Sequence, residues 1–291
     1  MQQISQNIFF EDTYLGVTVG ALIYPFGVVA IDTPLRAEDT RSWRASINHY
    51  RGGPNRLLVS LDAHPDRTLG ARALECTVIS HQKSAQVFRN RPTIFKGLSV
   101  ETGGIWEMYG EAIGLRWVSP DITFTDKMYL HWGPQEVVLE SHPGPNPGSI
   151  WVVIPEAKTV FVGDTLVLNQ PPFLAQADLP LWLESITSLQ KTYSGYSIVC
   201  GRGGLARPED LRGMIKIIKD ISAHVENLGK KNAPPESTQD LASRLVNKFP
   251  ASGKLKELYL VRLRYGLHQY YSRRFRPANV IGQPEIEEEE T

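Results

Sequence analysis

An apolar stretch at residues 57–61 ends abruptly in Asp62, His64, Asp66 and Arg67, and it restricts the fold more than any other part of the chain. The apolar residues predict a buried strand, and the polar residues follow where that strand ends. In α/β proteins, the loops at strand ends commonly carry the side chains that bind ligands or move protons. Carboxylates and an imidazole at this position therefore predict an α/β fold with a functional site at a strand end.

The rest of the pattern alternates strands with helices, which predicts sheets covered by helices. Two strands are expected within 14–32, and further strands at 56–61, 77–80, 127–131, 136–140, 149–154, 159–162 and 197–200. Helices are expected at 36–50, 68–75, 179–191, 208–228, 236–248 and 254–274. Residues 82–118 have weak periodicity and scattered glycines, so we expect an irregular insertion there.

Several of these strand ends resemble motifs of the metallo-β-lactamase superfamily. Its metal-binding signature, Thr-His-x-His-x-Asp-His, is similar to the run at 61–67. Gly163-Asp164 resembles the strand end whose aspartate bridges two zinc ions, and Gly201-Arg202-Gly203 resembles one that reads Gly-His-Gly. The likeness spans roughly residues 14–225. It implies a four-layer αββα sandwich with a metal site at one edge between the sheets.

The resemblance also indicates which residues stand where the family has metal ligands. The positions that still hold residues able to bind a metal are Asp62, His64, Asp66 and Asp164. The positions that do not are Arg67, Pro145 and Arg202. His142 precedes the substituted Pro145 in the same loop, and it would join the site only if that loop were rebuilt.

Two hypotheses follow from this set of residues. A zinc hydrolase needs several imidazoles and a carboxylate that leave one position open for a water whose pKa falls to roughly 7. Guanidinium groups at Arg67 and Arg202 would instead take the space and charge of the ions and pair with the carboxylates. The first hypothesis is therefore a degenerate metallo-β-lactamase-fold protein without a cofactor, which lacks dinuclear zinc hydrolase activity and acts in binding or assembly.

The alternative is a hydrolase with a remodelled site for a single divalent ion. Oxygen-rich ligands with one nitrogen suit Mn²⁺ or Fe²⁺, and Zn²⁺ is a further candidate. Such an enzyme would hydrolyse an ester, lactone, thioester or phosphodiester, with Asp66 or Asp164 as the catalytic base. The two hypotheses differ in whether the arginines bond to the carboxylates or the carboxylates face an open cavity.

The composition indicates which partners and which cellular compartment to expect for the protein. The net charge is zero, so nothing draws the chain toward nucleic acid or an anionic membrane. Cys76 and Cys200 lie far apart, which fits a reducing compartment. No apolar run approaches the roughly 18 residues that span a bilayer, and the first residues show no secretory signal. We therefore expect a cytoplasmic protein.

The chain divides into three predicted parts. Residues 1–230 form the metallo-β-lactamase-like domain, 231–280 a C-terminal helical extension, and 281–291 an acidic tail expected to be disordered. Leucines recur at helical spacing in 254–274, among several arginines. This extension is expected to pack on the domain, on a second copy of the chain or on a protein partner.

Overall fold

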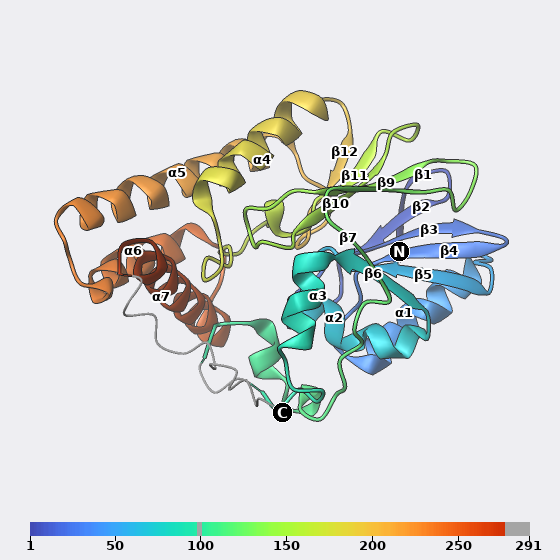
Figure 1. Ribbon diagram of the computed structural model, residues 1–291, viewed down its shortest axis with the longest axis horizontal. Coiled ribbons are helices and arrows are strands. Elements are labelled where there is room, and N and C mark those ends of the chain that lie inside the picture. The colour runs from blue at the N-terminus through green and yellow to red at the C-terminus, as the bar shows by residue number, and fades with distance from the viewer. Residues whose placement is uncertain (98–100, 277–291) are drawn as a thin grey trace, which may run out of the picture.

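The computed structural model describes residues 1–97 and 101–276. Two β-sheets pack face to face, and helices cover the outer face of each sheet, so that the protein has four layers in the order helix, sheet, sheet, helix (Figure 1). The predicted α/β class, the αββα sandwich and the C-terminal helical extension are confirmed.

The first sheet has seven strands that lie side by side in chain order. They are β1 (Gln2–Ser5), β2 (Ile8–Glu11), β3 (Val19–Tyr24), β4 (Gly27–Ile31), β5 (Asn55–Val59), β6 (Thr77–His81) and β7 (Ile122–Phe124). Strands β1 to β4 are antiparallel, and β4 to β7 are parallel. Helix α1 (Ala37–His49) makes the crossover from β4 to β5, and α2 (Pro65–Thr68) follows β5.

The second sheet has five strands in the order β12-β11-β10-β9-β8. They are β8 (Lys127–Leu130), β9 (Val137–Ser141), β10 (Ile150–Ile154), β11 (Thr159–Phe161) and β12 (Ser197–Val199). Only β11 and β12 are parallel to each other, and α4 (Leu179–Thr192) lies between them in the chain.

Apolar side chains from both sheets form one central core. Val29 and Ile31 of β4 pack in the same buried cluster as Val152 of β10 and Phe161 of β11. The two sheets approach so closely that a Cβ atom at Gly20 would overlap the ring of Phe161. Glycine is therefore required at this position by packing rather than by backbone conformation.

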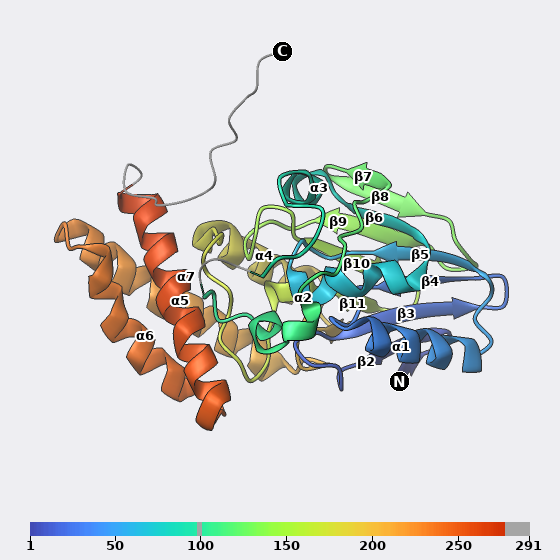
Figure 2. The same cartoon turned by 90° about the horizontal axis from the view of Figure 1, so that it is seen from below.

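The second sheet is covered by a larger helical layer. Helices α4, α5 (Pro208–Lys230), α6 (Gln239–Leu245) and α7 (Gly253–Phe275) share one buried cluster with this sheet. Trp182 of α4, Ile218 of α5 and Leu263 of α7 are each fully buried in it. Figure 2 shows α7 lying beside α5 and α6 at the end of the molecule. The C-terminal helices are thus joined to the domain by a shared core.

Several local predictions were wrong. Strands β1, β2 and β7 were not predicted, because their apolar runs are very short. The helix expected at 68–75 is a short α2 followed by the 3₁₀ turn Leu69–Leu74. Within the segment predicted to be irregular, α3 (Gln82–Arg89) is a regular helix, capped by His81, whose Nδ1 accepts a hydrogen bond from the Lys83 N–H. The acidic tail lies outside the described residues.

Candidate functional site

Polar side chains that follow the buried strands gather at one edge of the two sheets. Asp32 directly follows β4, and Asp62 and His64 lie in the loop between β5 and α2. Asp164 lies in the 3₁₀ turn after β11, and Arg202 lies in the loop after β12. The ends of these strands therefore deliver polar residues to the same place. All of these side chains except that of His64 are fully buried.

Arg67 joins three of these carboxylates. Its Nη1 donates to Asp32 Oδ2 at 3.0 Å, and its Nη2 donates to Asp164 Oδ1. Its Nε lies 3.2 Å from Asp62 Oδ1 as an ion pair, at an angle that does not make a hydrogen bond. Asp32 is held in turn by the Leu61 N–H, which donates to Oδ1 at 2.8 Å. Arg67 is thus a buried centre that ties β4, β5 and β11 together.

Arg202 joins the remaining carboxylates. Its Nε and Nη2 donate to the two oxygens of Asp164 at 3.0 Å and 3.1 Å, in a bidentate pair. Its Nη1 and Nη2 donate to both oxygens of Asp66, and Nη1 also donates to the backbone oxygen of Gly16. Bidentate guanidinium–carboxylate pairs are among the strongest hydrogen-bonded pairs in proteins. Asp164 therefore accepts from both arginines.

The pKa values show how burial and charge compete in this cluster. Burial raises the pKa of Asp32 to about 7, against the opposing charge of Arg67. Burial also raises the pKa of Asp62 and Asp164. The charge of Arg67 at Asp62, and of Arg202 and Arg67 at Asp164, together with His64 beside both carboxyls, outweighs this effect and holds both pKa values below the ordinary range. Burial lowers the pKa of Arg67, and the surrounding carboxylates reverse this effect and raise it well above its usual value. The arginines and at least two of the carboxylates are therefore charged at neutral pH.

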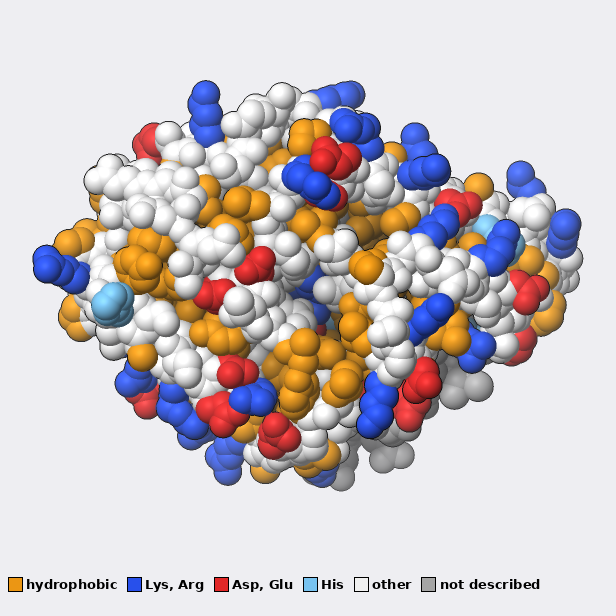
Figure 3. Space-filling view, turned by 180° about the vertical axis from the view of Figure 1, so that it is seen from behind, with side chains coloured by type: hydrophobic (Ala, Val, Ile, Leu, Met, Phe, Trp, Pro, Cys, Tyr) orange, Lys and Arg blue, Asp and Glu red, His pale blue; other side chains and the backbone are white. Residues whose placement is uncertain are grey.

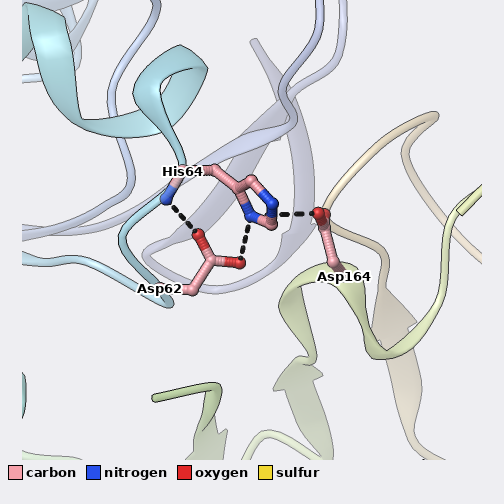
Figure 4. Close-up of side chains that lie close together, drawn as sticks. All are labelled: Asp62, His64 and Asp164. Atoms are coloured by element: carbon pink, nitrogen blue, oxygen red, sulfur yellow. Dashed lines mark hydrogen bonds and ion pairs between the residues drawn. The ribbon is translucent and has the colours of Figure 1, made fainter. Parts of the chain in front are cut away.

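Asp62, His64 and Asp164 form the candidate metal centre within the described residues (Figure 4). His64 Nδ1 lies 3.1 Å from Asp62 Oδ2 and 3.5 Å from Asp164 Oδ2. Neither His64 Nδ1 nor Asp62 Oδ2 has a hydrogen-bond partner in the described part of the chain. Ligands about 2.1 Å from a tetrahedral ion lie about 3.4 Å apart. These three atoms therefore fit one small divalent ion.

A pair of ions does not fit these residues. Asp164 Oδ1 accepts hydrogen bonds from both arginines, and both oxygens of Asp66 accept from Arg202. A second ion beside Asp66 and Asp164 would have to displace a fully buried guanidinium group and leave it unpaired. Removing one partner from a buried ion pair costs about 3–5 kcal/mol. The space of a second ion is thus filled by the protein itself.

The other residues singled out in the sequence lie outside this cluster. The ring of His142 stacks on Trp151, with 3.4 Å between the ring centroids, and its Nε2 lies 3.2 Å from Glu140 Oε2. Pro145 lines a cavity next to His64. The structure therefore brings together Asp62, His64, Asp66, Arg67, Asp164 and Arg202, and leaves His142 and Pro145 apart from them.

Sequence reasoning did not place two residues at this site. Asp32 directly follows β4, but its bond to Arg67 depends on the parallel pairing of β4 and β5. Arg262 of α7 is 1% exposed, and its guanidinium carbon lies 4.1 Å from the centroid of the Phe173 ring, which also contacts Arg202. Within the helix pattern, Arg262 looked like one of several surface arginines, and no signal marked it as buried.

A cavity of about 500 Å³ opens next to this cluster. His64, Trp106 and Phe173 line it on the side of the cluster, and Arg262 and Tyr265 line it from α7. Pockets for small molecules commonly have about 300–1,000 Å³. The buried cluster is therefore bordered by a space large enough for a small organic molecule.

The fold can now be compared with known proteins. No protein-family model matches the chain, and no curated protein sequence matches it. A metallo-β-lactamase from Pontibacter korlensis superposes with a TM-score of 0.56 and 20% identity, over 75% of this chain and 97% of that one. A metallo-β-lactamase from Erythrobacter litoralis superposes with a TM-score of 0.57 and 16% identity, over 75% and 95%. The chain therefore has the metallo-β-lactamase fold, as its motifs predicted.

Proposed function

We propose that this protein has the metallo-β-lactamase fold but works without a dinuclear zinc centre, and that it acts by binding rather than by zinc-dependent hydrolysis. The observation that carries the proposal is the position of Arg67 and Arg202 between Asp66, Asp62 and Asp164. Two permanently charged groups in this space supply the positive charge that ions would otherwise supply. The buried carboxylates then need no metal to be satisfied.

The cavity beside the cluster supports a binding role. It is closed on one side by α7, whose apolar residues Leu263 and Leu267 are fully buried against the rest of the chain. This packing favours a role for α7 in building the cavity. Docking of a second copy or a protein partner on the C-terminal helices remains a prediction. Among the described residues, no helix has the length and apolar character needed to cross a membrane.

A second candidate function is hydrolysis with a single divalent ion. The observation that favours it is the convergence of Asp62, His64 and Asp164, which includes two buried polar atoms without hydrogen-bond partners. These three residues would hold the ion, and the ion would supply an activated water for an ester, lactone, thioester or phosphodiester. Asp66 is bound to Arg202, so it would be a poor base in this arrangement.

Elemental analysis of the purified, tag-free protein separates these two candidates. The protein is incubated with Zn²⁺, Mn²⁺ or Fe²⁺ and desalted, together with the variants His64→Ala and His142→Ala. These variants remove the same side chain inside and outside the cluster. We expect less than about 0.1 equivalent of metal in all three proteins, because the ligand set lacks the imidazoles of a tight site. Near-stoichiometric metal that His64→Ala loses and His142→Ala keeps would overturn the proposal.

A further inference from the structure

Among the described residues, lysine and arginine side chains line the cavity beside the cluster, and acidic side chains do not. These cations are Lys83, Arg91, Lys96 and Arg262. His64 lies between the cavity and the carboxylates of Asp62 and Asp164. The charge of the whole chain is zero, and Figure 3 shows charges of both signs scattered over one face of the molecule. The excess of cations is therefore a local property of the cavity.

The side chain of Arg91 gives the clearest indication that a hydrogen-bonding anion is missing from the cavity. Its Nη1 is buried and has no hydrogen-bond partner among the described residues, and its guanidinium carbon lies 4.5 Å from the centroid of the Trp117 ring. Burial lowers its pKa to about 10, with only the more distant Asp62 acting against this effect. A partly buried guanidinium whose buried Nη1 lacks a partner among the described residues is costly unless a ligand pairs with it.

Arg262 faces the cavity from the other side. Its Nε donates to the Gly103 oxygen at 2.9 Å, and its Nη1 donates to the oxygens of Gln170 and Pro171 at 2.9 Å and 3.0 Å. Its Nη2 makes no hydrogen bond within the described part of the chain. Backbone and amide oxygens thus orient this guanidinium, but they leave its charge without a counter-charge.

Aromatic rings form the wall between Arg262 and the cluster. The rings of Trp106 and Phe173 stack with their centroids 5.6 Å apart and an angle of 16° between their planes. Phe173 also lies 4.7 Å from the ring of His64. The Trp106 Nε1–H is buried and has no acceptor among the described residues. This wall is apolar and carries one unused donor.

We infer that this cavity binds a small organic anion with a flat apolar body. Its carboxylate or phosphate group pairs with Arg91, while Arg262 adds positive charge from the other side of the cavity, and its apolar body packs against the wall of Trp106 and Phe173. Arginine suits either anion, because its planar donors match the oxygens of both groups. The inference rests on the proposed binding function and gives it a ligand class.

A matched pair of dyes tests the inference on the full-length protein. 8-Anilinonaphthalene-1-sulfonate carries a negative charge, and N-phenyl-1-naphthylamine has the same aromatic body without that charge. Fluorescence titration compares their dissociation constants for the wild type, for Arg91→Gln and for Arg212→Gln. Arg212 is an exposed arginine of α5, so its variant makes the same change outside the cavity.

The anionic dye is expected to bind the wild type at least about tenfold more tightly than the neutral dye, since a charge-assisted hydrogen bond contributes this much. Arg91→Gln is expected to remove that difference, and Arg212→Gln to retain it. Competition by benzoate or by phenyl phosphate then shows which anionic group is preferred. Equal binding of both dyes, or unchanged preference in Arg91→Gln with a native circular dichroism spectrum, would overturn the inference.

These results are independent of the metal measurement. If the dyes fail to discriminate while the metal content stays negligible, the ligand class is wrong and the metal-free proposal stands. If stoichiometric metal is bound through His64, the metal-free proposal fails, whatever the dyes show. Repeating the titration after treatment with a chelator keeps the two outcomes separate, because preference for the anion that depends on Arg91 must survive the removal of metal.

Discussion

At the scale of single residues, the site is defined by two buried arginines that pair with its carboxylates. Arg67 and Arg202 are almost completely buried, and both bond to Asp164. Burying such charges is costly, and the structure offsets the cost by surrounding each guanidinium with carboxylates. We therefore expect the cluster to be stable only when all of its members are present.

We therefore expect that removing either arginine strongly lowers the free energy of unfolding. We expect Arg202→Met to lower the free energy of unfolding by about 3–5 kcal/mol, because Asp66 and Asp164 would be left buried without their partner. Urea denaturation at pH 7 measures this change. Arg207→Met is the control, since Arg207 is an exposed arginine in a surface ion pair, and we expect it to change stability by less than about 0.5 kcal/mol. If Arg202→Met lowered the free energy of unfolding by less than about 1 kcal/mol, Arg202 would not be the essential partner of the buried carboxylates.

A second prediction concerns Glu140, which holds His142 away from the cluster. Hydrogen bonds from His142, Lys127 and Tyr193 lower the pKa of Glu140 from 4.5 to about 2, although burial opposes this. A carboxyl with a lowered pKa stabilises the fold above its unfolded pKa and loses this contribution as the pH falls from 4.5 toward 2.

Glu140→Gln is therefore expected to lower stability by about 1–2 kcal/mol at pH 7, after allowance for the partial exposure of the group. The difference between variant and wild type should shrink when urea denaturation is repeated at pH 3.5. A difference that stays constant between the two pH values would show that the charge of Glu140 has no such role.

The site residues at strand ends could be predicted from the sequence because they belong to recognisable motifs. Asp62, His64 and Asp66 lie within one short run, and Asp164 and Arg202 each follow a predicted strand. The role of Arg262 could not be predicted from the sequence, because its partners Gly103 and Gln170 lie far away in the chain. Only the docking of α7 brings these residues together.

At the scale of elements, the docking of α7 depends on a glycine. Gly103 has a φ of +68°, and a Cβ atom there would overlap the backbone of Arg262. Its oxygen also accepts the hydrogen bond from Arg262 Nε. The loop before the 3₁₀ turn Ile105–Met108 therefore fits against α7 only when residue 103 lacks a side chain.

We expect Gly103→Ala to lower the free energy of unfolding by about 1–3 kcal/mol, because both the positive φ and the overlap oppose the added methyl group. It should also weaken binding of the anionic dye by displacing Arg262. Gly110→Ala is the matched control, since a Cβ atom at Gly110 would meet nothing within 4 Å. Equal stability of the two variants in urea denaturation would refute this contact.

The elements themselves were predictable to different degrees. Long buried strands such as β4 and β10, and helices such as α5, were predicted because their apolar patterns are continuous. The strands β1 and β2 were missed because each is only four residues long and its apolar run is correspondingly short. Helix α3 was missed because a histidine cap is a weak signal in sequence.

At the scale of the whole molecule, the helical layer and the second sheet form one structural unit. Side chains of α4, α5 and α7 are buried in one cluster with Val153 and Val160 of the second sheet. We therefore expect one cooperative thermal transition in which the calorimetric and van't Hoff enthalpies agree. A separate transition that belongs to α6 and α7 would contradict this shared core.

We propose that Arg67 and Arg202 take the place that metal ions would otherwise occupy in this protein. The most direct measurement is an anomalous difference map at the zinc absorption edge, from crystals grown with Zn²⁺. We expect no anomalous peak among Asp62, His64 and Asp164, and electron density for both guanidinium groups against these carboxylates. A fully occupied zinc ion about 2.0–2.2 Å from these side chains, with either arginine displaced, would contradict it.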